Sequence, residues 1–593
     1  MVSNYAWLLG AVAAIYPISS SRGTRLLFEG QLGARSDVLE FWSRSSLLAP
    51  SERSLHVGKQ VVEQSGQYPC EKVLYVTDIE GDIDWFEGIV DVSEVFVRSK
   101  GELWLVPGSC FVFGGDVVDR FPGDLRTLDM LIALHARHPN QVFFIMGNRD
   151  INKLRLASEL GDVCLGVPAD ECTNADFECN ADCKEEAKTT TQSLAARVKW
   201  LFKYTLGGRR TFDNRKKELG MEGVKSSNHS EIKEDEDVAR NFLAEVLPPN
   251  GRLFKYMKLA KLVHRIHDTV FVHASLQLPS LRNMPTLKMK YNKTVTPGIR
   301  ASGSIPRFDA WARDLNEFAE AAVREYERQP QWREPLGHFG GEALVCYQSD
   351  SCMGGKEKSV VVAEWPEVQA DGSLHVGDGV ATFLRAAGVR RVCTGHKPAA
   401  VVPLITHSFE NIELVMADSS YAGDSAIEVL IQYKGLPQQI HQGRPQRIHQ
   451  GRPQQIHQGR PQRIHQGRPQ RIQSVVRAHG TFKDRQSGET YQVDTFSDDS
   501  YIGQSSVVTG GTPPWWVLAR LPGECSLPGD CSNREDGKHS YLMMQKHRRE
   551  WKYVFGCLPE EVEEALVMDP TLVCNRPSRI HTPDPCHLND DCD

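Results

Sequence analysis

The sequence predicts an α/β fold in which a buried sheet carries polar residues along one rim. Three short apolar stretches, rich in β-branched and aromatic residues, each end abruptly in Gly, Asp or Asn. They are KVLYVTDIEGD (72–82), FVFGGDVVDR (111–120) and VFFIMGNRD (142–150). Such runs are typical of strands in a sheet covered on both faces, and residues after strand carboxyl ends line the ligand crevice of open α/β sheets. We therefore expect Asp78, Asp116 and Asn148 to lie close together.

Apolar residues at helical spacing separate the second strand from the third. The segment LRTLDMLIALHARH (125–138) predicts the crossover helix of a β-α-β unit. The strand pattern resumes further along the chain, and each apolar run again ends in polar residues. These runs are TVFVHAS (269–275), VRRVCTGHKP (389–398) and IELVMADSS (412–420). They add His273 and His396 to the same rim.

Two long stretches interrupt the strand pattern. Residues from about 151 to 262 predict a helical insertion that caps the rim. This insertion contains four cysteines within a span of twenty residues. The second stretch contains a helix-like segment at 308–329. We expect the main domain to extend over residues 71–425, with residues 22–70 as a lead-in. Whether the insertion is a lid over the site is a hypothesis.

The C-terminal part has a different pattern. Alternating apolar runs from 426 to 557 predict a small antiparallel β-domain. An octapeptide repeat at 437–472 interrupts it, with units such as PQRIHQGR. Because each unit contains Pro and Gly and only one apolar residue, the repeat cannot form a packed core. Its His and Arg suit a metal or an acidic partner, and a tolerated expansion at a loop tip is the alternative. Residues 558–593 form a Cys-rich tail.

Composition places the chain among ordinary globular proteins. Of its 593 residues, 40% are hydrophobic and 24% charged, which leaves room for a sizeable core. The net charge is −7. Since there is no excess of basic residues, nucleic acid is not indicated as a partner.

The N-terminus and the cysteines bear on the compartment. Residues 1–21 are uncharged and contain an apolar run too short to span a bilayer comfortably, which predicts a signal peptide. A signal anchor or a buried N-terminal helix is the alternative, and no other stable membrane span is expected. Glycosylation sequons begin at Asn228 and Asn292. Together these features favour the secretory pathway or the extracellular space, with disulfides. Reduced cysteines in a cytoplasmic protein are the other interpretation.

The polar strand ends offer carboxylate, amide and imidazole groups. The candidate metal ligands are Asp78, Glu80, Asp116, Asn148, His273 and His396. This mixture suits two divalent ions such as Mn²⁺, Fe or Zn²⁺. One carboxylate can bridge both ions, and the water between them becomes a nucleophile at neutral pH. A single such residue is often structural, but a series of polar motifs that each end an apolar run indicates a site.

This ordered set resembles the calcineurin-like metallophosphoesterase superfamily, whose pattern is D-x-H, G-D-x-x-D, G-N-H-[DE], a lone His and G-H-x-[HP]. The resemblance covers residues from about 72 to 420, and GDVVDR (115–120) is similar to the serine/threonine protein phosphatase version. It implies a four-layer αββα sandwich and metal-dependent hydrolysis of a phosphorylated substrate.

The resemblance also implies roles for individual residues. Asp78 would bind the first ion, and Asp116 would bridge the two. The second ion would be held by Asn148, His273 and His396. Arg120 would bind the substrate phosphate, and Asp119 would support the histidine of the G-N-H motif.

Two positions differ from the family pattern. Glu80 and Arg149 stand where the family has histidines. Arg149 is always cationic and can bind phosphate oxygens, but it cannot supply a proton. We therefore expect it to pair with Asp119, and we expect hydrolysis to favour good leaving groups such as aryl phosphates or phosphoanhydrides. The alternatives are an inactive pseudophosphatase that acts as a binding module, and an interaction protein that works through the β-domain and repeat.

Overall fold

The structure is a computed structural model, and it describes most residues from Cys70 to Cys557. The described ranges are 70–162, 164–173, 179–191, 193–221, 235–289, 295–301, 304–331, 340–349, 354–365, 375–398, 403–408, 410–419, 425–434, 473–483, 490–496, 507–508, 515–524, 539–547 and 550–557. The predicted N-terminal segment, nearly all of the lead-in, both sequons, the octapeptide repeat and the Cys-rich tail lie outside these ranges.

The first predicted strands form the centre of a mixed sheet. Strands β1 (Lys72–Val76), β4 (Ser109–Phe113) and β5 (Val142–Phe144) are adjacent and parallel. Every residue of β4 is buried, as expected of a strand covered on both faces. The crossover helix predicted at 125–138 is confirmed as α2 (Asp124–Arg137). A second helix, α1 (Ile83–Val92), begins after Asp82, whose carboxylate accepts the Trp85 N–H at 3.0 Å.

A second mixed sheet carries the two histidines. Its order is β11-β12-β10-β7-β6. The bounds are β6 Val263–Ile266, β7 Thr269–Val272, β10 Arg391–Thr394, β11 Leu404–His407 and β12 Glu413–Met416. Strands β7, β10 and β12 are parallel. Because β7 ends at Val272 and β10 at Thr394, His273 and His396 follow two neighbouring carboxyl ends.

Alternate residues of the central strands belong to two different cores. Val73, Tyr75 and Val112 share one core with Phe271 and other residues of the second sheet. The rings of Tyr75 and Phe271 lie 5.4 Å apart. The intervening residues of β1 and β4 pack into a larger core that includes helices α1 and α2. The period of two along each strand therefore places one face toward the other sheet and one toward helices.

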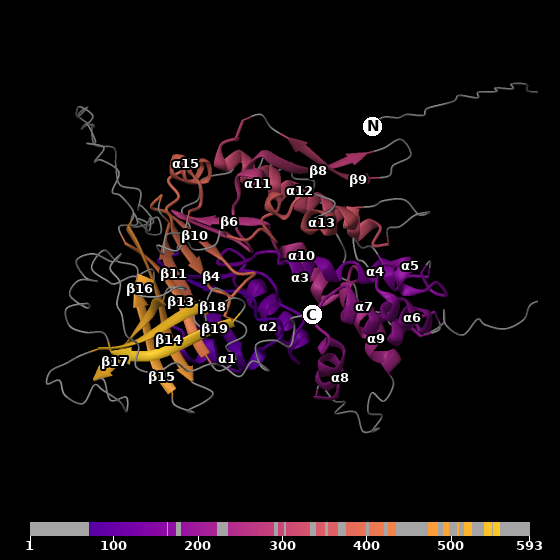
Figure 1. Cartoon of the computed structure of the whole chain (residues 1–593), viewed down its shortest axis with the longest axis horizontal. Helices are drawn as coiled ribbons and strands as arrows, with labels where there is room; N and C mark the ends of the chain where they lie inside the picture. Colours follow the sequence, from indigo (N-terminus) through magenta and orange to yellow (C-terminus); the bar gives the residue numbers. More distant parts are fainter. Residues whose placement is uncertain are drawn as a thin grey trace, which may run out of the picture. The chain divides into compact units, whose positions relative to one another are not determined.

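The strands predicted as a separate β-domain extend the first sheet instead. Strand β13 (Ser425–Lys434) pairs antiparallel with β1, so the sheet is continuous across the boundary predicted at 425/426. Its ten strands have the order β19-β18-β17-β15-β14-β13-β1-β4-β5, with β16 beside β17; β13 to β19 are orange to yellow in Figure 1. The remaining bounds are β14 Gln473–Lys483, β15 Thr490–Phe496, β16 Val507–Val508, β17 Trp515–Glu524, β18 His539–His547 and β19 Glu550–Cys557.

Helices occupy most of the chain between β5 and β6, the region of the predicted insertion. They are α3 Asn148–Lys153, α4 Leu156–Glu159, α5 Ala169–Cys172, α6 Ala181–Thr189, α7 Leu194–Tyr204, α8 Thr211–Met221, α9 Asp235–Val246 and α10 Arg252–Leu259. Helices α4 to α9 lie together in Figure 1 and contact one another. Disulfides join Cys164 to Cys172 and Cys179 to Cys183, and a third joins Cys70 to Cys110 on β4.

Smaller elements complete the described chain. The helix predicted at 308–329 is confirmed as α12 (Phe308–Arg328). The others are β2 Phe96–Ser99, β3 Glu102–Leu105, α11 Leu278–Arg282, β8 Asn283–Met289, β9 Val295–Ala301, α13 Gly340–Gln348, the 3₁₀ turn η1 Lys356–Lys358 and α15 Asp378–Ala386. Within the described ranges, no helix combines the length and apolar character that crossing a membrane requires.

A buried histidine on strand β6 of the second sheet should make stability depend on pH. His264 stacks on Phe143 with ring centroids 4.1 Å apart, and burial, together with Lys261, lowers its pKa to about 3. The unfolded chain binds this proton near pH 6.5, so the stabilisation is complete above that pH and is lost as the pH falls toward 3. The free energy of unfolding is measured in urea at pH 8 and at pH 5 for the parent and for His264→Phe. Between these two pH values we expect the variant to lose about 2 kcal/mol less than the parent. Equal losses in both proteins would contradict a neutral buried His264.

Candidate metal centre

The loops that follow the strands have an unusual backbone conformation. Asp78, Glu80, Asp116 and His396 have φ angles of 52°, 48°, 55° and 73°, in the left-handed region that side chains rarely adopt. Such strain is found mostly at functional sites. A side chain at Gly395 would collide with the carboxylate of Asp78, which explains the glycine beside His396. The strand ends are therefore brought together at close range.

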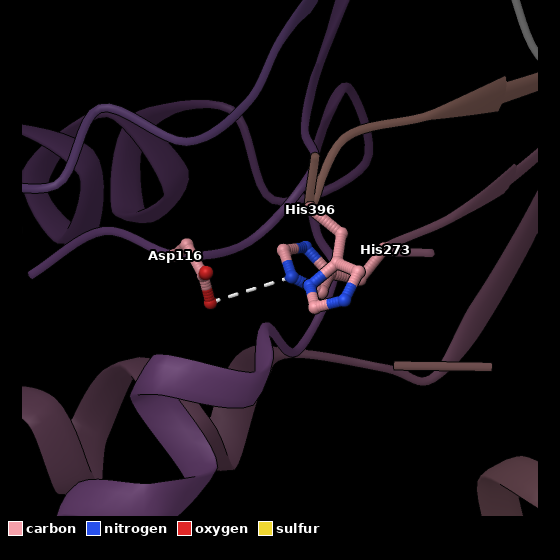
Figure 2. A group of neighbouring side chains, drawn as sticks. All are labelled: Asp116, His273 and His396. Atoms are coloured by element: carbon pink, nitrogen blue, oxygen red, sulfur yellow. Dashed lines mark ion pairs between the residues drawn. The ribbon is translucent and has the colours of Figure 1, made fainter. Parts of the chain in front are cut away.

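One group of candidate ligands lies around Asp116. Figure 2 shows Asp116, His273 and His396 with their side chains directed toward one another. His273 Nε2 is 3.4 Å from Asp116 Oδ1. Asn148 Oδ1 lies 2.9 Å from His273 Nε2 and 3.0 Å from His396 Nδ1. The four side chains predicted to surround the second ion therefore converge.

A second group shares Asp116 with the first. One carboxylate oxygen each from Asp78, Glu80 and Asp116 lies within 4.8 Å of the others, and all three residues are buried. Like charges this close are unfavourable in a buried site unless a cation or a proton relieves them. The two groups meet at Asp116, which is the arrangement expected of a carboxylate that bridges two ions.

The ligand side chains are held by their own hydrogen bonds. His273 Nδ1 lies 2.9 Å from the Gly114 carbonyl oxygen, which directs Nε2 toward the centre. Asp78 accepts hydrogen bonds from the Thr77 hydroxyl and, at 3.1 Å, from the His396 N–H. Buried Asp150 was not predicted as a site residue, but it accepts the N–H groups of Asp116 and Val117 at 2.9 Å. It thereby fixes the loop that presents Asp116.

The electrostatics of the centre also fit bound cations. Burial raises the pKa of Asp78 well above its usual value, with Asp418 adding to the effect. Burial likewise raises the pKa of Glu80 to about 7, although Arg149 and Arg120 oppose it. Burial alone would lower the pKa of His273, but Asp116 raises it to about 10. In the absence of cations the carboxylates thus draw protons into the site, so divalent ions would satisfy the same excess of negative charge.

The two residues that depart from the family pattern contact each other. Arg149 Nε lies 2.8 Å from Glu80 Oε1, and Arg120 Nε lies 2.8 Å from Glu80 Oε2. Arg149 Nη1 is 2.6 Å from Asp119 Oδ2, which confirms the predicted Asp119–Arg149 ion pair. The side chains of Glu80 and Asp119 are buried, and those of Arg120 and Arg149 are mostly buried.

Further contacts to this cluster come from residues that carry no motif. Lys153 Nζ on α3 lies 3.0 Å from Asp119 Oδ2. Thr211, the first residue of α8, donates its hydroxyl to Asp119 Oδ1 at 2.8 Å. Asn214 on the same helix donates to the Arg120 carbonyl oxygen. The insertion therefore packs directly on the loop that presents Asp119 and Arg120.

No protein-family model matches the sequence. Among solved structures, the chain is similar to a protein serine/threonine phosphatase from Saccharomyces cerevisiae, with 12% sequence identity and a TM-score of 0.26. The alignment covers 62% of this chain and 74% of the yeast chain.

Proposed function

We propose that this chain is a calcineurin-like metallophosphoesterase that hydrolyses phosphoesters with two divalent ions, drawn from Mn²⁺, Fe and Zn²⁺. One observation carries the proposal: two groups of metal-ligand side chains, buried except for the partly exposed His396, share Asp116. Asp78 and Asp116 would hold the first ion. The second would be held by Asp116, Asn148, His273 and His396. When bound, the ions would supply a water that is nucleophilic at neutral pH.

The arginines would bind the phosphoryl group of the substrate. Arg120 and Arg149 lie beside the metal centre, and Arg149 Nε is 3.7 Å from Asp116 Oδ2. Guanidinium groups bind phosphate oxygens and stabilise the charge that develops on them. Asp119 Oδ2 holds Arg149 at Nη1, and Lys153 contacts the same Asp119 oxygen. Since arginine does not release a proton, the leaving group would depart without acid assistance from this residue.

Two further parts of the proposal concern the layers of the fold and the compartment in which the chain folds. The shared core between the two sheets, with helices on the far face of β1 and β4, supports a four-layer αββα arrangement. The disulfides support folding in an oxidising compartment such as the secretory pathway. A purified protein with no free thiol at Cys70 and Cys110 would agree with this, whereas alkylation of both would contradict it.

A pseudophosphatase is the second candidate, and Glu80 is the observation that favours it. Each oxygen of its carboxylate contacts an arginine, so the first ion has fewer ligands than the family pattern provides. The two candidates differ in a direct assay. Purified protein, dialysed and then loaded with Mn²⁺, Fe²⁺ or Zn²⁺, should hydrolyse p-nitrophenyl phosphate and lose this activity on chelation. Binding of orthophosphate without any hydrolysis would favour the pseudophosphatase.

The contact between the insertion and Asp119 should affect the activity. We expect Thr211→Val to lower kcat/KM for p-nitrophenyl phosphate about tenfold, because Asp119 then holds Arg149 less firmly. Thr211→Ser keeps the hydroxyl and is the matched control, so it should retain nearly full activity. Similar values for the Val variant and the parent would show that α8 has no part in positioning Asp119.

A further inference from the structure

Glu80 is fixed in place by its backbone as well as by its side chain. Its N–H donates to the Asp116 carbonyl oxygen at 3.0 Å, and its own carbonyl accepts the N–H groups of Arg120 and Phe121 at 2.9 Å. These bonds join the loop after β1 to the loop after β4. With a left-handed backbone at φ 48°, the direction of the Glu80 side chain is set by both loops.

The Glu80 carboxylate contacts the guanidinium groups of two arginines, in each case at Nε. Each oxygen lies 2.8 Å from an arginine Nε, and the Glu80 side chain is only 5% exposed. Opposite charges this close attract strongly where water is largely excluded. These ion pairs hold each guanidinium beside Glu80. Arg149 Nη1 is also 2.6 Å from Asp119 Oδ2, and guanidinium groups can bind phosphate oxygens.

The position of Arg149 bears on whether Glu80 holds a metal ion. Arg149 Nε lies 2.8 Å from Glu80 and 3.7 Å from Asp116 Oδ2, so its guanidinium lies close to both carboxylates. An ion shared by Glu80 and Asp116 would have to approach that positive charge, and like charges repel. An ion held by Asp78 and Asp116 avoids it. Two carboxylates, with water and substrate phosphate, form an adequate site for a hard divalent ion.

We propose that Glu80 is a positioning residue that orients Arg120 and Arg149 toward the phosphoryl group of the substrate, and that it is not a metal ligand. The inference rests on the proposed function and adds the residue that organises anion binding at that site. It also explains why the two departures from the family pattern occur together. Glu80 in place of histidine supplies the counter-charge that Arg149 needs when it is buried.

The test measures metal content and phosphate affinity separately. Glu80→Gln, Glu80→His and Asp78→Asn are compared with the parent as Mn²⁺-loaded full-length proteins. Metal is counted by elemental analysis after dialysis, and orthophosphate binding is measured by calorimetry. We expect Glu80→Gln to keep the parental metal content and to weaken orthophosphate binding about tenfold, with KM raised more than kcat is lowered. Asp78→Asn should instead lose metal.

The histidine variant separates the two roles. A histidine can bind a metal ion but cannot pair with two arginines, so we expect Glu80→His to weaken phosphate binding as much as Glu80→Gln. In an Arg149→Ala background, Glu80→Gln should have a much smaller effect, because the residues act as a unit. If Glu80→Gln lost about one metal equivalent and Glu80→His regained it, the inference about Glu80 would be overturned, and the proposed function would stand. A parent protein that binds neither metal nor orthophosphate would overturn the proposed function, and the inference with it.

Discussion

An Asp116→Asn variant is expected to lose about three orders of magnitude in kcat/KM toward p-nitrophenyl phosphate and to lose bound metal. Asp116 is the one carboxylate that belongs to both ligand groups, so removing its charge weakens both proposed ion sites at once. The amide keeps the size of the side chain and its contact with the Arg149 N–H, which is 2.8 Å long in the parent. The change therefore tests charge more than packing. Activity and metal content are measured on the same preparation.

The control for this experiment is an exposed aspartate that lies outside the site. Asp309 on α12 has a side chain that is 76% exposed, and surface ion pairs contribute little to stability. Asp309→Asn should therefore resemble the parent in activity, metal content and thermal unfolding. An Asp116→Asn protein that is folded, loaded with metal and fully active would contradict the assignment of Asp116 as the bridging ligand.

A strong preference for good leaving groups is the second large effect expected. General acid catalysis contributes about 10² to 10⁴-fold when the leaving group is poor, and Arg149 cannot provide it. We expect kcat/KM for p-nitrophenyl phosphate to exceed that for a phosphoserine peptide by at least about a hundredfold. A series of aryl phosphates should show rates that rise steeply as the pKa of the leaving phenol falls. Equal turnover of the aryl ester and the phosphoserine peptide would contradict this account of Arg149.

A double variant provides the matched comparison. Glu80→His with Arg149→His gives the family pattern at both positions and removes both charges of the Glu80–Arg149 pair together. It introduces a proton donor beside Asp119, so the ratio between aryl and alkyl substrates should narrow. If the ratio stays as wide as in the parent, the leaving-group preference has a cause other than the missing histidine.

The rim of polar residues could be predicted because each polar group directly follows a strand. Asp78, Asp116, Asn148, His273 and His396 stand one or a few positions after apolar runs, and parallel strands bring such positions to one edge. The structure gathers the oxygens and ring nitrogens of these residues into two close groups that share Asp116. The Asp119–Arg149 pair was also predictable, because an arginine in place of the histidine leaves the same acidic neighbour.

The continuity of the first sheet was not predictable. The mostly apolar run AIEVLIQY (426–433) predicts a strand, but such a run is the same whether the strand begins a new sheet or extends an existing one. Only the pairing of Leu74 with Leu430 and of its neighbours shows which occurs. Thr211 was missed for a related reason. It lies 92 residues from Asp119 in the sequence, and an isolated threonine in a helical insertion carries no motif.

The role proposed for Glu80 differs from the role expected from the sequence for an electrostatic reason. From the sequence, a carboxylate in the second position of the D-x-H motif indicates a metal ligand. In the structure its oxygens contact Arg120 and Arg149, and on that ground we propose that Glu80 holds the two arginines and not an ion. The sequence contains both substitutions, but not their contact.

The most direct test of the two-metal centre is anomalous diffraction from crystals grown with Mn²⁺ and orthophosphate. The proposal predicts two manganese peaks, one on each side of Asp116. Asp78 should ligate one of them, and Asn148, His273 and His396 should ligate the other. The phosphate should lie against both ions and the two arginines. A map with phosphate on the arginines but no metal peak at Asp116 would contradict the claim that this chain is a metal-dependent phosphoesterase.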